Sequence, residues 1–261
     1  MNMHTTEAAL FDPAVNMARQ SLYRFAALSL LDPRQGSWKN LRALREDRLL
    51  HESADFLRTL PEARPARLGV GELPLNNLDP GYVLARLPGS PELFNAEYES
   101  AFGLLVSCAC PPHEIEYVPS KFDFQRSNGL ADISGFYHAF GLTIADEHPE
   151  RPDHIVLELE FMAFLLGLER RAAEFSDVER GQICREAQAM FLSEHLAWWA
   201  PAFARLLARE AADGFYAAVA DFLAALIPAE RALVGVEVPG RPAAPTQIER
   251  PEACEGCKIS T

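Results

Sequence analysis

Apolar residues recur at intervals of three and four positions along most of the chain, which is the spacing of one face of an α-helix. The first such stretch, 14–31, has its apolar positions at Val15, Ala18, Leu22 and Phe25. Asp32 then precedes Pro33, and because the residue before a proline avoids the α region, the helix should end there. A second helix is predicted within 38–60, again with apolar residues on one side.

Helix-start and helix-end signals divide the rest of the chain. Ser90 and Pro91 form a helix start, because serine caps the first turn and proline is tolerated at its first position. That helix should end near Gly103 or Ser107, and a capping-box pattern at Ser176 opens another helix. Further helices are predicted over 129–140, 153–171, 194–210 and 213–227.

Segments rich in proline and glycine are predicted to be loops, and they lie at 61–90, 108–127 and 143–152. The alternation that marks a strand occurs only briefly, at 234–238. The predicted fold class is therefore all-α, a helical bundle in a single two-lobed domain over 1–227, with a hinge near 143–153. Residues 228–261 contain five prolines and are predicted to form a mobile tail.

The segment after Asp153, HIVLELEFMAFLLGLER, is apolar on almost every side, which indicates a buried central helix. Asp153 itself is a suitable N-cap for this helix. Glu158 and Glu160 are two positions apart, so they project about 200° apart around the helix axis. At least one of the two carboxylates should therefore lie inside and meet an Arg or a Tyr, because an unpaired buried charge is costly.

Composition and charge exclude several classes of protein. The 261 residues are 49% hydrophobic and carry a formal net charge of -13, whereas a nucleic-acid-binding protein needs a basic surface. No apolar run approaches the roughly 20 residues of a membrane span, and no signal-peptide pattern opens the sequence, so we expect a cytoplasmic protein. The motifs GxGxxG, GxxxxGKS/T, HExxH, GxSxG and Glu-x-x-His are absent, which removes the sites they would form.

The cysteines could provide a metal site. Cys254 and Cys257 have CxxC spacing, and with Cys108 and Cys110 they could supply four thiolates to zinc. A single CxxC in a tail is a weak signal, so these cysteines are predicted to be unrelated thiols. Cys184 is predicted to be a small core residue.

A tandem pair of tryptophans, Trp198 and Trp199, has the composition of a ligand platform. Its helical spacing with Leu196 and Phe203 instead places at least one of the two rings in the core. His195, just before the pair, is predicted to lie at a helix surface or boundary.

Five segments occur in the order found in one family of chaperones. They are EYESAF at 97–102, PPHEIEY at 111–117, ADISGFYHAFGL at 131–142, HPERPDHIVLELEFMAFL at 148–165 and FLSEHLAWWAPAF at 191–203. With them, 14–227 resembles the TorD/DmsD/NarJ family of cytoplasmic chaperones for molybdenum enzymes. The similarity points to the branch that serves type II enzymes of the dimethyl sulfoxide reductase family. The combination of PDH with ELEFM is its most specific part.

The resemblance implies a TorD-like all-helical fold and no catalysis, and we expect no cofactor and no metal site. Such a chaperone binds the apo catalytic subunit of a molybdenum oxidoreductase, often through its twin-arginine signal peptide. It holds that subunit until the molybdopterin guanine dinucleotide cofactor is inserted, which prevents premature export.

The resemblance also implies a recognition surface, made by an aromatic helix, the loop after it and an Asp-His pair at the hinge. Carried over to this chain, the surface comprises Tyr98, Ala101, Phe102, Pro112, His113, Glu114, Tyr117, Asp153 and His154. Relatives can carry an aromatic residue where this chain has His113. Between Glu92 and Asp123 there are six acids and one base, so the acids could meet arginines of a peptide while the rings take its apolar part. The alternative is that the rings belong to the core and the acids are only solvated.

Two other functions stay open from the sequence. A small all-α enzyme could use Asp153, His154 and Glu158 for acid–base or metal chemistry, since His154 and Glu158 share a helix face. No third ligand or nucleophile is evident near them. A thiol-based metal or redox sensor could use Cys254 and Cys257.

Overall fold

The computed structural model describes residues 12–103, 110–118, 123–143 and 150–240, with side chains in the third range described from Ser127 onward. Within these residues all regular elements are helical, and a single antiparallel bridge joins His113 to His154. The all-α fold class is therefore confirmed. The α-helices are α2 (Pro13–Leu30), α3 (Ser37–Ala43), α4 (Arg48–Thr59), α5 (Pro80–Ala85), α6 (Pro91–Phe102), α7 (Asp123–Ala139), α8 (Ile155–Glu174), α9 (Val178–Phe191), α10 (Ala197–Glu210) and α11 (Phe215–Val234).

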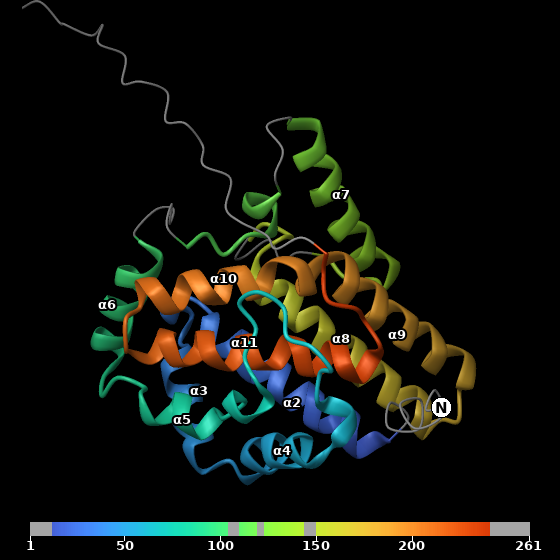
Figure 1. Ribbon diagram of the computed structural model, residues 1–261, viewed down its shortest axis with the longest axis horizontal. Coiled ribbons are helices and arrows are strands. Elements are labelled where there is room, and N and C mark those ends of the chain that lie inside the picture. The colour runs from blue at the N-terminus through green and yellow to red at the C-terminus, as the bar shows by residue number, and fades with distance from the viewer. Residues whose placement is uncertain (1–11, 104–109, 119–122, 144–149, 241–261) are drawn as a thin grey trace, which may run out of the picture.

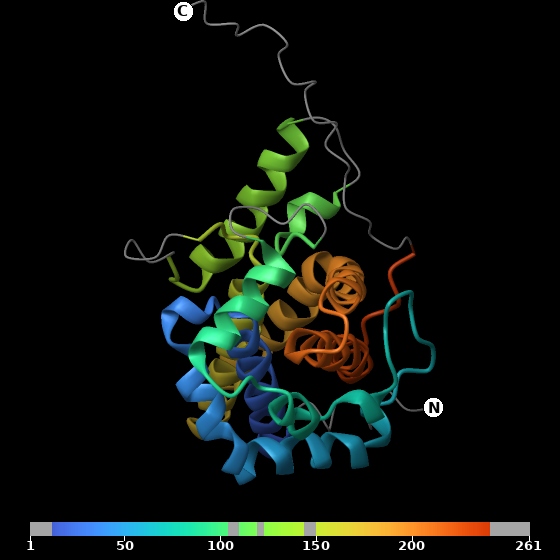
Figure 2. The ribbon, with the colours of Figure 1, turned by 90° about the vertical axis from the view of Figure 1, so that its left-hand side faces the viewer.

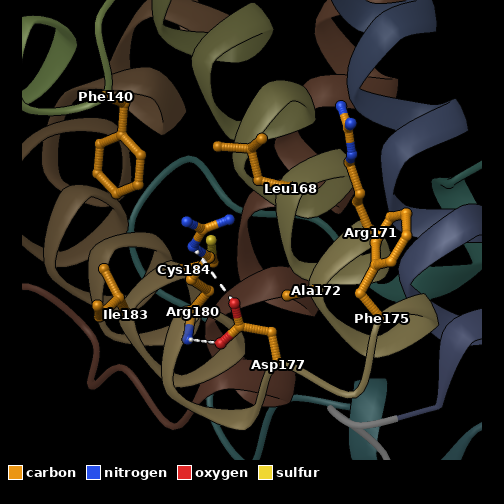
Figure 3. Close-up of a pocket in the computed structure, with 9 residues that line it drawn as sticks. All are labelled: Phe140, Leu168, Arg171, Ala172, Phe175, Asp177, Arg180, Ile183 and Cys184. Atoms are coloured by element: carbon orange, nitrogen blue, oxygen red, sulfur yellow. Dashed lines mark hydrogen bonds and ion pairs between the residues drawn. The ribbon is translucent and has the colours of Figure 1, made fainter.

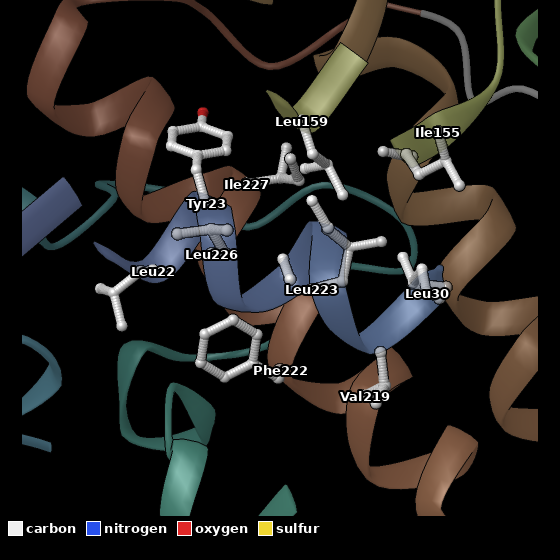
Figure 4. Packing of buried hydrophobic residues seen from close by; sticks show 14 of the residues in the cluster. Leu22, Tyr23, Leu30, Ile155, Leu159, Val219, Phe222, Leu223, Leu226 and Ile227 are labelled. Atoms are coloured by element: carbon white, nitrogen blue, oxygen red, sulfur yellow. The ribbon is translucent and has the colours of Figure 1, made fainter. Parts of the chain in front are cut away.

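The centre of the molecule is formed by α2, α8 and α11 (Figure 1). Figure 4 shows Tyr23 of α2 near Leu226 and Ile227 of α11, with Leu159 of α8 beside them, and all four side chains are fully buried. Burying a leucine side chain contributes roughly 1.5–3 kcal/mol, so this contact region is a main source of stability. Around it, α10 packs along α11, α9 along α8, and α4 across α2.

Helix α7 projects from one end of the body, as the quarter turn between Figures 1 and 2 makes clear. Its C-terminal half packs against α8 and α9. The Tyr137 ring lies 5.0 Å from that of Phe161 on α8, and the Phe136 ring lies 5.3 Å from that of Phe191 on α9. This half of α7 is therefore held against the body of the protein by aromatic contacts with α8 and α9.

Local capping signals fixed several helix ends as predicted. The Ser90 hydroxyl accepts the backbone N–H of Leu93 at 3.3 Å, and α6 ends at Phe102. Gly103 follows with φ of 75°, a conformation that glycine adopts without the steric penalty of a Cβ atom. The predicted breaks at Ser90 and Gly103 are therefore confirmed.

Other boundaries differ from the prediction. The helix expected within 38–60 is divided into α3 and α4, because the Asp47 side chain accepts the N–H of Leu50 and starts a new helix. In the expected loop 61–90, Asp79 caps the short helix α5 in the same way. Helix α7 begins at Asp123 rather than at residue 129. Asp177, not Ser176, caps α9.

The C-terminal helix α11 does not end at Ile227, so the predicted tail does not begin at Pro228. Proline lacks the N–H that would bond to the carbonyl four residues earlier, which is that of Ala224. The N–H of Leu73 bonds to that carbonyl instead, at 2.9 Å, and the helix continues to Val234. Residues 234–238 form no strand, and 241–261, including Cys254 and Cys257, lie outside the described residues.

No helix among the described residues combines the length and the apolar character needed to cross a lipid bilayer.

Candidate functional site

Two backbone hydrogen bonds join residues 112–114 to the start of α8. Residue 114 is the first residue of the 3-10 turn η5 (Glu114–Tyr117). The N–H of Glu114 donates to the carbonyl of Asp153, and the N–H of Ile155 donates to that of Pro112, both at 2.9 Å. This pairing brings together six of the nine predicted site residues: Pro112, His113, Glu114, Tyr117, Asp153 and His154.

Asp153 does not cap α8, and that prediction is wrong. The cap is His154, whose Nδ1 accepts the N–H of Val156 at 3.2 Å. Asp153 is fully buried and accepts the N–H of Ile115 at 3.1 Å. It also accepts two hydrogen bonds from Arg151, at 2.7 and 3.0 Å. Its charge is therefore neutralised inside the protein, and its role is to lock the two segments together.

His154 lies against His113, with ring centroids 5.0 Å apart and the planes nearly perpendicular. Burial, with the neighbouring charge of His113, lowers the pKa of His154 to about 4. His154 is therefore a neutral imidazole at physiological pH. The Nε2 of His113 lies 3.4 Å from a carboxylate oxygen of Glu150, which is partly exposed.

A buried polar cluster lies behind this pair and is centred on Glu114. Its carboxylate accepts hydrogen bonds from the Trp198 indole at 2.9 Å and from the Nδ1–H of His195 at 3.0 Å. His195 is only 3% exposed, so its predicted place at a helix surface or boundary is wrong. It is drawn inward because a buried carboxylate needs a donor, and the imidazole N–H supplies one.

Glu158 is the second carboxyl group of this buried cluster. It is fully buried and accepts the indole N–H of Trp199 at 3.1 Å. Burial raises the pKa of Glu158 well above its ordinary value, and the negative charge of Glu114 raises it further. The protonated, neutral form of Glu158 is therefore favoured. Glu160 is exposed, which confirms that one of the two glutamates lies inside.

The partner of Glu158 differs from the predicted Arg or Tyr. The tandem indoles donate one to each carboxyl group, Trp198 to Glu114 and Trp199 to Glu158. Trp199 is fully buried, which confirms that at least one ring belongs to the core. The missed signal is the spacing of His195, Trp198 and Trp199, since positions three and four apart share a helix face.

The turn that carries His195 is π-helical, spanning Leu192–Leu196 between α9 and α10. Such one-turn π segments are rare and often occur at functional sites. On its far side, His195 Nε2 lies 3.6 Å from a carboxylate oxygen of Asp132 on α7. The projecting helix is thus connected to the buried cluster through His195.

The remaining predicted site residues, Tyr98, Ala101 and Phe102, lie on α6. The rings of Tyr98 and Phe102 are 4.7 Å apart, and both pack against Tyr216 of α11. Burial raises the pKa of Tyr98 to about 12. Ala101 and Phe102 are buried, so in this helix the alternative that the rings belong to the core is largely correct.

A row of aromatic rings nevertheless connects α6 to the buried cluster. Phe102 stacks near Phe203 with centroids 6.4 Å apart, and Phe203 lies 5.7 Å from Trp199. Tyr117 of the η5 turn lies 5.2 Å from the same indole. The two parts of the predicted surface are therefore parts of one packed unit.

The acidic residues of this region are less available to a peptide than expected. Glu97 accepts the N–H of Tyr216 at 3.3 Å, where α11 begins. Glu114 is buried, and Glu116 is paired with Arg151. Among the acids whose side chains are described, Glu92 and Glu99 are exposed.

Only three of the nine predicted site residues are partly open to solvent: Tyr98, Pro112 and His113. The other six are buried and hold these three in place. Any direct contact with a partner at this site therefore falls on the three open side chains and their exposed neighbours.

The largest pocket described lies on another part of the molecule and includes none of the predicted site residues. It has a volume of about 660 Å³ and lies between α8, α9 and the end of α7 (Figure 3). Phe140, Leu168 and Ile183 give it an apolar wall, and the ion pair of Asp177 with Arg180 lies at 3.3 Å beside it. Cys184 lines the wall but is buried.

Groups able to hold a metal occur twice among the described residues. They are His113 with Glu150 and His154, and Asp132 with Glu194 and His195. Burial raises the pKa of the Cys110 thiol, so it is not a ready thiolate ligand. Cys108, Cys254 and Cys257 lie outside the described residues, and the thiol site stays untested. The trio of Asp153, His154 and Glu158 forms no such group, since Asp153 is held by Arg151 and Glu158 by Trp199.

Comparison with known proteins gives this arrangement a context. Residues 88–205 match the family model described as nitrate reductase delta subunit. The chain is 37% identical over 117 residues to the selenate reductase assembly chaperone protein of Thauera selenatis, covering 45% of this chain and 58% of that protein. It is 34% identical over 110 residues to the chlorate reductase assembly chaperone protein of Ideonella dechloratans, covering 42% and 55%. It is 33% identical over 92 residues to the chaperone protein TorD of Aliivibrio salmonicida, covering 35% and 41%.

The chain spans about half the length of the curated relatives it matches. The matched segment nevertheless contains all nine predicted site residues and both buried glutamates. Residues 88–205 are therefore similar to the nitrate reductase delta subunit family, and the chain shares sequence similarity with reductase assembly chaperones and with TorD, in agreement with the predicted resemblance to the TorD/DmsD/NarJ family.

Proposed function

We propose that this protein is a cytoplasmic assembly chaperone for a molybdenum oxidoreductase of the dimethyl sulfoxide reductase family, in its type II branch. It binds the catalytic subunit before the molybdenum cofactor is inserted and releases it afterwards. It is not itself an enzyme. The twin-arginine signal peptide of that subunit is one segment that it recognises.

One observation carries this proposal. The segment that matches the family model, 88–205, is the segment that contains the buried Glu114–Glu158 cluster and the open residues beside it. Relatives of this segment are named as assembly chaperones of selenate and chlorate reductases. The shared part of the chain is thus the part with the candidate site.

The chemistry of the open residues is suited to a peptide. Tyr98 offers a ring and a hydroxyl, Pro112 an apolar edge, and His113 an imidazole next to the carboxylate of Glu150. Glu92 and Glu99 add exposed negative charge on α6, which favours a partner segment that contains arginine. The buried residues supply rigidity, which reduces the ordering cost of binding.

The test is capture of the client from cells. A tagged chain should co-purify with a reductase catalytic subunit from a host strain that cannot make the molybdenum cofactor. Capture should fall strongly when the cofactor is supplied, because the loaded subunit no longer needs the chaperone. Mass spectrometry identifies the subunit, and metal analysis measures its molybdenum content. Equal capture of loaded and empty subunit would contradict the proposal.

Variants then locate the binding surface. Tyr98→Ala and His113→Ala should weaken client capture. His113→Ala should change the thermal unfolding of the free chain little, whereas Tyr98→Ala also removes ring contacts with Phe102 and Tyr216, so its capture is measured well below its unfolding transition. Tyr82→Ala is the matched control, since Tyr82 is also a partly exposed ring but lies on α5. Calorimetry with a synthetic twin-arginine peptide, and with the same peptide lacking both arginines, tests the signal-peptide part separately. Binding of both peptides with equal affinity would remove that part.

A further inference from the structure

His195, on the π-helical turn between α9 and α10, has one ring nitrogen without a hydrogen-bond partner although its side chain is almost fully buried. The ring donates its Nδ1–H to the carboxylate of Glu114 at 3.0 Å. In the neutral imidazole, the Nε2 atom then carries a lone pair. Among the described residues, no group forms a hydrogen bond with this Nε2 atom. Buried polar atoms usually have a partner, so the free lone pair needs an explanation.

Two carboxylates lie beside this nitrogen. An oxygen of Asp132 on α7 is 3.6 Å from Nε2, which is too long for a hydrogen bond. The carboxylate of Glu194 completes a group in which one ligand atom of each residue lies within 4.8 Å of those of the other two. Two ligand atoms at about 2.1 Å from a tetrahedral ion are separated by about 3.4 Å. The spacing of Asp132 and His195 therefore fits ligands of one metal ion.

The hydrogen bond on the other side of the His195 ring is of the kind that a metal-bound histidine makes. A ligating histidine almost always donates its second ring N–H to a carboxylate, a carbonyl or a water, which fixes the tautomer and orients the ring. Glu114 is that carboxylate here, and it also accepts the indole N–H of Trp198 at 2.9 Å. The nitrogen that faces Asp132 is thus the one that can bind an ion.

The charges around the group favour a cation. Neither Asp132 nor Glu194 forms an ion pair with an arginine or a lysine in the part of the chain that the structure describes. Both carboxylates are exposed, so an ion can reach the Nε2 atom from solvent. One imidazole with two carboxylates suits zinc and other divalent transition metals, whereas magnesium and calcium prefer oxygen ligands alone.

We propose that Asp132, Glu194 and His195 bind one divalent transition-metal ion through the Nε2 atom and the two carboxylates, with water completing its coordination. The ion would connect the projecting helix α7 to the π-helical turn, next to the aromatic contacts that already hold the C-terminal half of α7. This inference does not rest on the proposed function, because metal binding is a property of the free chain.

The other group, His113 with Glu150 and His154, does not form an equivalent site. The Nδ1 atom of His154 accepts the N–H of Val156, so the neutral ring carries its proton on Nε2. That ring has no nitrogen free for an ion, and one imidazole with one carboxylate is left. The hydrogen bonding of His195 is the reverse, because its Nδ1 donates and its Nε2 is free.

The experiment uses Zn²⁺ as the probe and measures its affinity for the full-length, tag-free chain by competition with a chromophoric chelator. The background carries Cys108→Ser, Cys254→Ser and Cys257→Ser, so that these thiols cannot contribute. We expect one zinc ion per chain, which excess Mg²⁺ does not displace. Asp132→Asn and Glu194→Gln should each weaken binding by more than about 10-fold, because loss of even a second contact to a metal ligand costs 10- to 100-fold.

Matched controls distinguish ligation from a general loss of charge. Glu186→Gln removes an exposed carboxylate of α9, His138→Ala removes an exposed imidazole of α7, and neither should change the affinity. His195→Asn keeps an N–H that can donate to Glu114 but removes the Nε2 atom, so it should abolish binding. The two exposed carboxylate variants decide the outcome if this buried substitution lowers the stability of the chain.

A second measurement locates the ion on α7. Zinc at about ten times its dissociation constant should slow amide exchange around Asp132 by about 10-fold, because only the closed helix presents the whole site. An imidazolium of His195 paired with Asp132 would instead give two protonated ring nitrogens in the nitrogen NMR spectrum and no zinc binding. That result, equal affinities of Asp132→Asn and Glu186→Gln, or unchanged exchange in α7 would overturn the proposal.

Discussion

Glu114 in the η5 turn and Glu158 on α8 illustrate how one buried residue changes the pKa of another. Glu114 receives two N–H donors, from Trp198 and His195. Glu158, with one indole donor and the Glu114 charge beside it, is more stable with its proton. Protonation of Glu158 removes one of two neighbouring negative charges that would otherwise repel each other.

A first prediction concerns the neighbouring glutamates on α8. Glu158→Ala should lower the free energy of unfolding by about 1–3 kcal/mol, because it leaves the buried indole N–H of Trp199 without an acceptor. Glu160→Ala is the matched control and should change it by less than about 0.5 kcal/mol, since that side chain is exposed. Urea unfolding of both variants measures the difference. Equal values would mean that the Trp199 contact contributes nothing.

A second prediction follows from the raised pKa of Glu158. The folded chain keeps a proton that the unfolded chain releases near the ordinary value of 4.5. As the pH rises from there to the folded pKa, this group's contribution to stability falls by about 1.4 kcal/mol per pH unit. Glu158→Gln keeps an oxygen that can accept the Trp199 indole N–H, and it does not titrate, so it should lose this component. Unfolding free energies of the two proteins should diverge with rising pH, and parallel curves would contradict the assignment.

At the scale of elements, the sequence predicts helix ends that depend on local capping residues, but it does not predict hydrogen-bond partners that are distant along the chain. Ser90 and Gly103 define the ends of α6 with their own side chain and backbone, and the sequence predicts both. Asp153 has an equally suitable N-cap sequence, yet Arg151 and the N–H of Ile115 recruit its carboxylate, and His154 caps α8 instead. Which residue caps α8 therefore depends on a contact with Ile115, 38 positions before Asp153, and a local sequence pattern contains no information on so distant a contact.

The C-terminal half of α11 provides a third prediction through the buried pair of Arg19 and Glu230. Both side chains are fully buried, and they share contacts of 2.7 and 3.0 Å. Glu230→Ala should cost about 3–5 kcal/mol, because it leaves the guanidinium group buried without its partner. Replacing both residues, as Arg19→Met with Glu230→Leu, should recover most of the loss.

Denaturant unfolding of the single and double variants measures this difference. The matched control is the exposed pair of Arg48 and Glu52, 3.1 Å apart, where Glu52→Ala should cost less than about 1 kcal/mol. A double variant that is no more stable than Glu230→Ala would show that the loss comes from packing rather than from the stranded charge.

At the scale of the molecule, the end of the folded unit lies beyond the predicted boundary. A fourth prediction is that truncation after Ile227 abolishes cooperative unfolding, because it removes Glu230 and the buried Leu233. It also removes Arg231, whose pair with the buried Glu72 has a contact of 2.6 Å. Truncation after Gly240 keeps all three and should leave the transition nearly unchanged. Circular dichroism during heating distinguishes the two, and similar melting of both would return the boundary to Ile227.

The sequence predicts which residues form the candidate site, but it does not predict how deeply they are buried. The family resemblance assigned Pro112, His113, Asp153 and His154 to one surface, and the structure pairs the two segments that carry them. Burial could not be read in the same way. Exposure depends on what covers a residue, and for Glu114 the cover comes from α10, more than eighty positions later.

The carbonyl of Ala224, left free by Pro228, has a consequence for amide hydrogen exchange. Its partner, the N–H of Leu73, belongs to a segment without regular structure, where amides normally exchange fast. Because this proton is held by the central helix, it should exchange only when α11 opens, far more slowly than that of the exposed Val70 nearby. A proline inside a helix thus turns a loop amide into a reporter of the stability of the core.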